Sequence, residues 1–132
     1  MKLAAKIVTW LIALFYSYGA AVHVFNILGV SGFDWSAAPL KWQVLDILYL
    51  VIDLLVFVGL VLGWKIGFAA FYVAAISQIF LYTVFRDWIV DVPAGFTVSE
   101  AQQGYLTALV IFHCMTVILF TSALWIRSKP VQ

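Results

Sequence analysis

The stretch QVLDILYLVIDLLVFVGLVL (residues 43–62) decides the fold of this chain. Its only charged residues, Asp46 and Asp53, stand among long apolar runs. A helix of about 20 residues rises ~30 Å, which is the thickness of the hydrocarbon core of a bilayer. The stretch therefore predicts a membrane-spanning helix with two acidic side chains on it.

Three more apolar runs of similar length occupy residues 7–29, 66–85 and 105–126. Barrel strands alternate in polarity over about ten residues, and these runs do not alternate. Helices also satisfy every backbone polar group where no water is present. The linker Gly63-Trp64-Lys65 is so short that the second and third helices must be antiparallel neighbours. We expect residues 1–132 to form a single all-α domain, an integral membrane four-helix bundle.

The composition excludes several other classes of protein. Of the 132 residues, 66% are hydrophobic and 10% are charged, whereas soluble domains average about 45–50% and about 25%. The net charge of +1 lacks the basic excess that nucleic-acid binding requires, so no nucleic acid is expected. Cys114 is the only cysteine and cannot form an intrachain disulfide.

The basic residues predict the orientation in the membrane. With the amino terminus inside, five basic residues face inward: Lys2, Lys6, Lys65, Arg127 and Lys129. Only Lys41 and Arg86 face outward. This positive-inside bias predicts a multi-pass protein of the bacterial inner membrane with both termini cytoplasmic. The outer loop at 86–104 ends in Ser99-Glu100-Ala101-Gln102, a capping-box pattern that predicts a helix start.

Each predicted helix carries one polar residue at a similar depth. With a rise of 1.5 Å per residue, His23, Asp53, Gln78 and His113 lie roughly 9–13 Å below the outer ends of their helices. Because polar side chains are costly in hydrocarbon, we expect all four to face one interior site.

Helical periodicity extends this layer toward the outer side. Asp46, Tyr49 and Asp53 share one side of the second helix. Asp46 and Arg86 lie at the outer rim, where we expect them to form an ion pair. The result is a predicted polar pocket that opens outward above an apolar floor.

Four hypotheses account for the polar layer. The side chains could form ordinary interhelical hydrogen bonds that fix the register of the helices. They could bind a small molecule or lipid head group, with Asp53 holding a cationic or hydroxyl group. His23 and His113 could ligate haem iron or another metal. A proton relay through the histidines and aspartates is the fourth, since imidazole titrates near neutral pH.

Two segments resemble the DoxX-like group of small four-helix bacterial membrane proteins. They are Tyr18-Gly19-Ala20-Ala21-Val22-His23 on the first helix and Gly59-Leu60-Val61-Leu62-Gly63-Trp64-Lys65 at the end of the second. Members of the group often carry a basic residue near the position of His23, and this sequence departs from the pattern there. The resemblance implies a compact four-helix bundle, often an accessory to redox or oxidation systems.

We expect an accessory subunit or a small-ligand or lipid binder rather than a self-sufficient enzyme. The alternatives are a membrane redox protein that binds haem through His23 and His113, and a small oligomeric transporter. Besides the lipid bilayer, the expected partners are other membrane subunits or further copies of the chain. Five aromatic residues of the third helix predict such a partner surface: Phe68, Phe71, Tyr72, Phe80 and Phe85.

Overall fold

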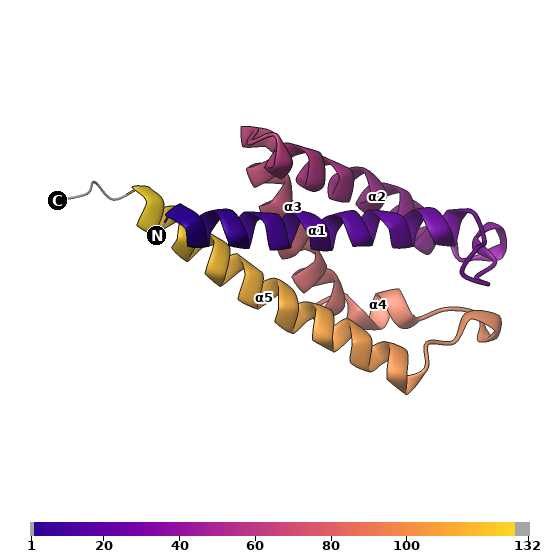
Figure 1. Cartoon of the computed structure of the whole chain (residues 1–132). Coiled ribbons are helices and arrows are strands. Elements are labelled where there is room, and N and C mark those ends of the chain that lie inside the picture. Colours follow the sequence, from indigo (N-terminus) through magenta and orange to yellow (C-terminus); the bar gives the residue numbers. More distant parts are fainter. Residues whose placement is uncertain (1, 129–132) are drawn as a thin grey trace.

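The computed structural model describes residues 2–128 and is all-helical over that range, with no strand in it (Figure 1). The elements in chain order are α1 (Lys2–Ile27), η1 (Trp35–Ala37), α2 (Leu40–Val61), α3 (Lys65–Tyr82), α4 (Arg86–Val90), η2 (Ala94–Phe96) and α5 (Glu100–Ser128). The predicted fold class, an all-α bundle of four long helices, is confirmed. Each of the four long helices is long and apolar enough to cross a membrane.

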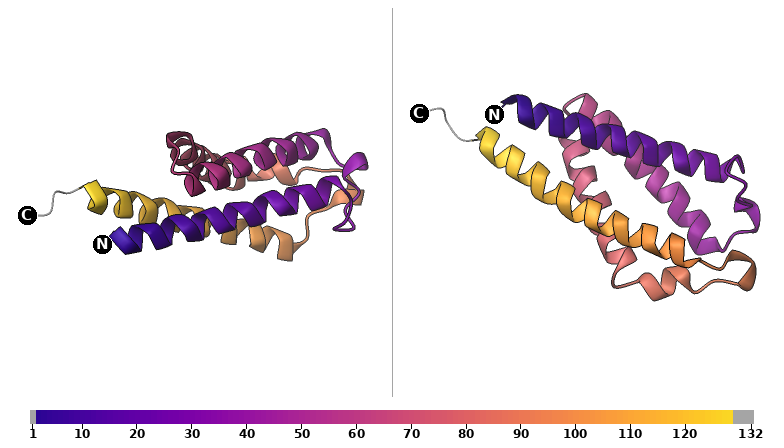
Figure 2. Two further views of the ribbon diagram at one scale, coloured as in Figure 1. Left: turned by 45° about the horizontal axis from the view of Figure 1, so that its top comes forward. Right: turned by 60° about the horizontal axis from the view of Figure 1, so that its bottom comes forward.

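The four long helices form a ring in which each packs mainly against two others. Helix α1 packs against α2 and α5, and α3 packs against the same two helices from the opposite side (Figure 2). The start of α1 and the end of α5 lie at one end of the bundle, and the η1 and η2 loops lie at the other end. We call these the terminal end and the loop end.

The sequence predicted the start of α5 but not the end of α3. At the start of α5, the Ser99 hydroxyl accepts from the Gln102 backbone N–H at 3.2 Å, and the Gln102 side chain accepts from the Ser99 N–H at 2.8 Å. The predicted capping box is therefore confirmed. Helix α3 ends at Tyr82 rather than at residue 85, and the chain turns at once into the short, unpredicted α4.

Glycines bring α2 and α3 into backbone contact at the terminal end. Gly63 adopts a left-handed φ of 69° and ends α2, and the Trp64 N–H donates to the Gly59 carbonyl at 2.7 Å. A Cβ atom on Gly59 would collide with the backbone of Gly67, and the reverse holds as well. The antiparallel pairing predicted from the short linker is confirmed, and it is as close as small residues permit.

An apolar core fills the bundle between its middle and its terminal end. Val56, Phe71 and Phe120 are fully buried, and the rings of Phe71 and Phe120 lie 4.8 Å apart. Phe68 stacks on the same Phe120 ring at 5.6 Å. Phe68 and Phe71 therefore pack in the interior of the bundle, against a phenylalanine of α5.

Only Phe80 and Phe85 of the five aromatic residues of the third helix are largely exposed, at 52% and 53%. Tyr72 is partly buried, and its hydroxyl lies 2.8 Å from that of Thr121 on α5. Most of the predicted partner surface is therefore part of the packing between α3 and α5.

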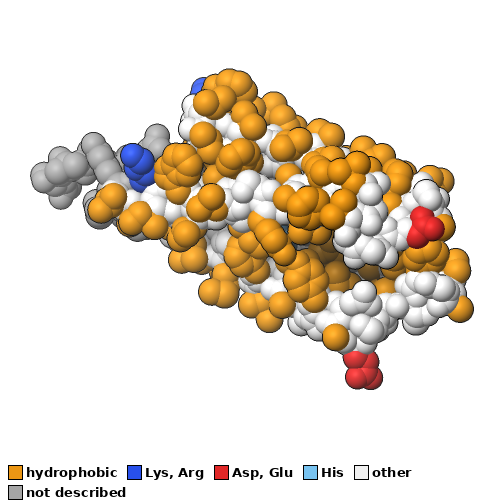
Figure 3. Space-filling model, turned by 45° about the vertical axis from the view of Figure 1, so that its right-hand side comes forward, with side chains coloured by type: hydrophobic (Ala, Val, Ile, Leu, Met, Phe, Trp, Pro, Cys, Tyr) orange, Lys and Arg blue, Asp and Glu red, His pale blue; other side chains and the backbone are white. Residues whose placement is uncertain are grey.

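Acidic side chains lie toward the loop end of the bundle (Figure 3), whereas the described basic residues lie at both ends, with Lys41 and Arg86 at the loop end. Lys6 and Lys65 lie on the first turns of α1 and α3, at the terminal end. Four acidic residues belong to the loop end: Asp34, Asp87, Asp91 and Glu100. Of the other basic residues in the positive-inside prediction, Lys129 lies outside the described residues, as do the side chains of Lys2 and Arg127. Hydrophobic side chains cover much of the face between the two ends.

Candidate functional site

A pocket of about 430 Å³ opens at the loop end, and all five α-helices contribute to its lining. Figure 3 shows a hollow in the surface toward this end. The walls are mainly apolar and aromatic, and they include Phe33, Trp42, Leu45, Leu81, Ile89 and Leu106. The polar lining comes chiefly from His23, Asn26, Asp46, Tyr49, Gln102 and Tyr105. No lysine or arginine lines it.

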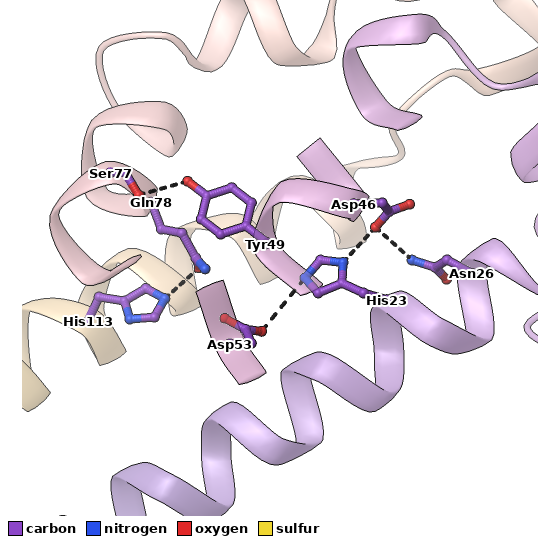
Figure 4. Close-up of polar contacts among 8 residues, drawn as sticks. All are labelled: His23, Asn26, Asp46, Tyr49, Asp53, Ser77, Gln78 and His113. Atoms are coloured by element: carbon purple, nitrogen blue, oxygen red, sulfur yellow. Dashed lines mark hydrogen bonds and ion pairs between the residues drawn. The ribbon is translucent and has the colours of Figure 1, made fainter. Parts of the chain in front are cut away.

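His23 and Asp46 form the closest polar contact in the pocket (Figure 4). Nδ1 of His23 lies 2.6 Å from Oδ1 of Asp46. With Asp46 as a carboxylate, which only accepts hydrogen bonds, Nδ1 of His23 is the donor in this contact. The Asn26 amide donates to the same oxygen at 3.5 Å, one helical turn beyond His23 on α1. Asp46 is 9% exposed, and among the described residues these two side chains are its hydrogen-bond partners.

Asp53 lies on the other side of the His23 ring, deeper in the bundle. Its Oδ2 is 3.8 Å from Nε2 of His23, and the residue is 3% exposed. Its Oδ1 has no hydrogen-bond partner among the described residues. A Cβ atom on Gly19 would collide with Oδ2, so glycine at this position of α1 leaves the space that the carboxyl group occupies. One imidazole thus stands between two carboxyl groups.

Gln78 and His113 form a second, separate pair. Oε1 of Gln78 accepts from Nε2 of His113 at 2.6 Å, and His113 is fully buried beside the rings of Phe15 and Tyr16. Neither residue lines the pocket. No hydrogen bond joins this pair to the His23 cluster in the described part of the chain.

Tyr49 lies between the His23 cluster and the Gln78–His113 pair (Figure 4). Its ring stacks on that of His23 with centroids 6.3 Å apart, and its hydroxyl lies 3.0 Å from that of Ser77 on α3. Ser77 is the neighbour of Gln78 in the chain. Tyr49 therefore holds the His23 ring in place and fixes α2 against α3, while still lining the pocket.

The four residues of the predicted layer all face the interior, but they divide into two places. Asp53, Gln78 and His113 are buried, and His23 is partly buried. Of the four, only His23 lines the pocket. Their hydrogen bonds form two groups, one between α1 and α2 and one between α3 and α5, and a single site shared by all four residues stays a prediction.

The expected ion pair between Asp46 and Arg86 is absent from the described residues. The Arg86 guanidinium instead donates to the Thr107 hydroxyl at 2.9 Å and to the Gln103 carbonyl, both on α5. The reason is that α3 ends at Tyr82, so Arg86 begins α4 and faces α5, while α1 supplies the partners of Asp46. Arg86 does not line the pocket.

The histidines do not fit ligation of one haem or metal ion. Both ring nitrogens of His23 face carboxyl groups, and Nε2 of His113 is bonded to Gln78. Within residues 2–128 there is also no group of three or more side chains arranged to hold a metal ion. Joint ligation would require His23 to give up a contact with a carboxyl group, whereas Nδ1 of His113 has no hydrogen-bond partner among the described residues.

Sequence reasoning missed several residues of the pocket. Asn26 lies three residues after His23 on the same face, which is a signal that could have found it. Gln102 was expected only as a helix cap, yet it also lines the pocket. Tyr82 lies four residues after Gln78 on the same face, which is also a signal. Trp42 and Tyr105 gave none, because aromatic residues near helix ends are typical of any membrane interface.

Comparison with known proteins finds no family model that matches the chain, and no curated protein or solved structure matches it either. The resemblance to the DoxX-like group therefore stays a prediction. The function must be inferred from the geometry of this chain alone.

Proposed function

We propose that this protein is a multi-pass protein of the bacterial inner membrane that binds a small amphiphilic ligand in the pocket at the loop end. The ligand carries a cationic or hydroxyl head group, and the protein acts as a binder or accessory subunit rather than as a self-sufficient enzyme. Four helices long and apolar enough to span a bilayer support the membrane location. The excess of basic residues at the terminal end supports cytoplasmic termini and a pocket that opens outward.

The Asp46 carboxylate carries the proposal. It is 9% exposed, lines the pocket, and has one imidazole and one amide as its protein partners. With Asp53 on the far side of the same ring, the cluster holds two carboxyl groups and no lysine or arginine. A buried carboxylate is stabilised by charged donors, and an entering ammonium or hydroxyl group supplies one.

The walls suit the rest of such a ligand. Pocket volumes of about 300–1,000 Å³ are usual for small-molecule sites, and this pocket lies in that range. Trp42, Tyr49 and Tyr105 add aromatic faces, which attract cations when they are shielded from water. The apolar walls accept a hydrocarbon portion.

The closed floor favours binding over conduction. Between the pocket and the terminal end lie the fully buried side chains of Val56, Phe71 and Phe120. Among the described residues, a core of apolar and aromatic side chains therefore lies between the Gln78–His113 pair and the terminal end. This arrangement supports a ligand-binding site more than the alternative of a transporter.

The test compares three head groups on one hydrocarbon chain. The full-length protein, reconstituted in zwitterionic lipid, is titrated with decylammonium, decanol and decanoate, and binding is followed by the fluorescence of the tryptophans. We expect decylammonium to bind most tightly and decanoate most weakly. Asp46→Asn should weaken decylammonium binding about tenfold, since a hydrogen bond to a charged group contributes about 1.5–3 kcal/mol.

Asp91→Asn is the matched control, because it removes one negative charge at the same end from a side chain that does not line the pocket. Its affinity for decylammonium should stay close to that of the unmodified protein. Equal binding of all three amphiphiles, or equal losses in Asp46→Asn and Asp91→Asn, would refute the proposed site.

A further inference from the structure

A second groove lies at the terminal end, between α1, the end of α2, the start of α3 and α5. Its volume is about 470 Å³. Leu60 and Phe120, which belong to the buried core, form its floor, and Phe68, Ala123 and Leu124 line its sides. The Thr9 hydroxyl also lines it but donates to the Ala5 carbonyl of its own helix at 2.8 Å. The interior of the groove is therefore apolar.

The groove has a polar end and an apolar end. Lys6 lies on the first turns of α1 and lines the groove. Trp10, 45% exposed, follows one turn deeper. Phe120 lies two turns before the end of α5, so the floor points toward the middle of the bundle. A charged mouth above an apolar interior matches a molecule with an anionic head and a hydrocarbon chain.

The charge around this groove has one sign. Among the residues that the structure describes, Lys6 is the only charged residue that lines it and no aspartate or glutamate does. Lys65 follows closely after the lining residue Gly63. All six acidic residues of the chain belong to the loop end or to the first four turns of α2, counted from that end. Basic grooves between helices on the cytoplasmic side are suited to anionic lipid head groups.

We infer that this groove binds one anionic phospholipid, with its phosphate at Lys6 and an acyl chain over Leu60 and Phe120. This site is separate from the pocket at the loop end and has the opposite charge preference. The inference rests on the proposed membrane insertion, but not on the ligand of the outer pocket.

The test uses the tryptophan at the groove as its reporter. The full chain is reconstituted in phosphatidylcholine vesicles that contain a small, fixed fraction of a lipid brominated on its acyl chains. In one preparation this lipid is brominated phosphatidylglycerol, and in the other it is brominated phosphatidylcholine. Subtraction of the Trp10→Phe signal isolates quenching of Trp10. We expect brominated phosphatidylglycerol to quench Trp10 more than brominated phosphatidylcholine does.

Lys6→Gln should reduce the preference for phosphatidylglycerol roughly fivefold, which is the effect of one lysine near an anionic surface. Lys65→Gln is the matched control, since Lys65 lies at the same end but does not line the groove. It should retain most of the preference. Ala123→Phe, checked for helicity by circular dichroism, should fill the groove and lower quenching by both lipids.

The outcomes separate the two proposals. Equal quenching by both brominated lipids, or equal effects of Lys6→Gln and Lys65→Gln, would overturn the lipid site and leave membrane insertion intact. Absence of quenching by either lipid would overturn insertion itself, and the lipid site with it. Binding of decylammonium at the loop end is measured in a separate experiment. Failure of the proposed outer pocket can therefore be told apart from failure of the lipid site.

Discussion

The two ends of this bundle hold cavities of similar size, about 430 Å³ at the loop end and 470 Å³ at the terminal end, but they differ in chemistry. The loop-end pocket places Asp46 beside His23, well inside the helices. The terminal groove places Lys6 at its mouth above an apolar interior. The two cavities therefore differ in the placement of charge rather than in size, and the two proposed ligands differ accordingly in the charge of their head groups.

The two ends are also held together differently. At the loop end, side chains cross between elements: the Trp42 indole donates to the Ile89 carbonyl at 2.9 Å, and the Lys41 ammonium donates to the Trp88 and Asp91 carbonyls. At the terminal end, Gly59 and Gly67 bring two backbones into contact. At the terminal end, α2 and α3 are therefore held by close backbone packing. At the loop end, hydrogen bonds between elements hold the structure and leave room for a pocket.

The strongest test of the comparison is whether the two ends face opposite sides of a membrane. In a Cys114→Ala background, Asp34→Cys and Pro93→Cys should react with an impermeant maleimide on right-side-out vesicles. Trp64→Cys, in the turn between α2 and α3, should react only after permeabilisation. The expected effect is all or none, because the reagent does not cross the bilayer. Labelling of Trp64→Cys from outside would invert the assignment of both cavities.

Gly59→Ala should cause the largest loss of stability. The added Cβ would collide with the Gly67 backbone, which cannot rotate away as a side chain can. We expect unfolding in detergent to lose about 3 kcal/mol, at the upper end of overpacking effects. Gly104→Ala is the control: its Cβ meets nothing within 4 Å, so alanine in α5 should stabilise by up to about 1 kcal/mol. Similar results for the two variants would contradict the close backbone contact.

Gln78→Leu separates the structural pair from the pocket. It leaves Nε2 of the buried His113 without its partner, which should cost about 2 kcal/mol of unfolding free energy. Decylammonium affinity should not change, because neither residue lines the pocket. The double variant Gln78→Leu with His113→Phe should recover much of the stability. A folded Gln78→Leu protein that no longer binds the amine would place the pair within the ligand site.

The smallest expected effect concerns the charge of Asp34 in the loop between α1 and α2. Hydrogen bonds from the Ser36 hydroxyl and the Ala37 N–H lower the pKa of Asp34 below its ordinary value. Because the folded pKa is the lower one, the stabilisation is present above the ordinary value and is lost as the pH falls through the folded pKa. Ser36→Ala should raise this pKa, as measured by NMR titration of the Asp34 carboxyl carbon. An unchanged titration in Ser36→Ala would refute the assigned cause.

The sequence predicted the features that depend on local composition. Apolar runs of spanning length gave the four long helices, the Gly63-Trp64-Lys65 linker gave the antiparallel pairing of α2 and α3, and Ser99 with Gln102 gave the start of α5. The inward direction of Asp53, Gln78 and His113 was predictable for a similar reason, since a polar side chain facing lipid is costly wherever its helix lies.

Only the tertiary structure decided which polar groups meet. Equal depth along four helices made one shared layer a reasonable prediction, yet His23 pairs with Asp46 and Gln78 pairs with His113. Partner choice depends on the rotation and crossing of helices, and these follow from contacts between residues far apart in the chain, such as Gly59 with Gly67 and Gly19 with Asp53. A hydropathy pattern gives the average surroundings of a helix face but not the identity of the side chain opposite. For that reason the end of α3 at Tyr82, which turns Arg86 toward α5 and leaves Asp46 to His23, could not be read from the sequence.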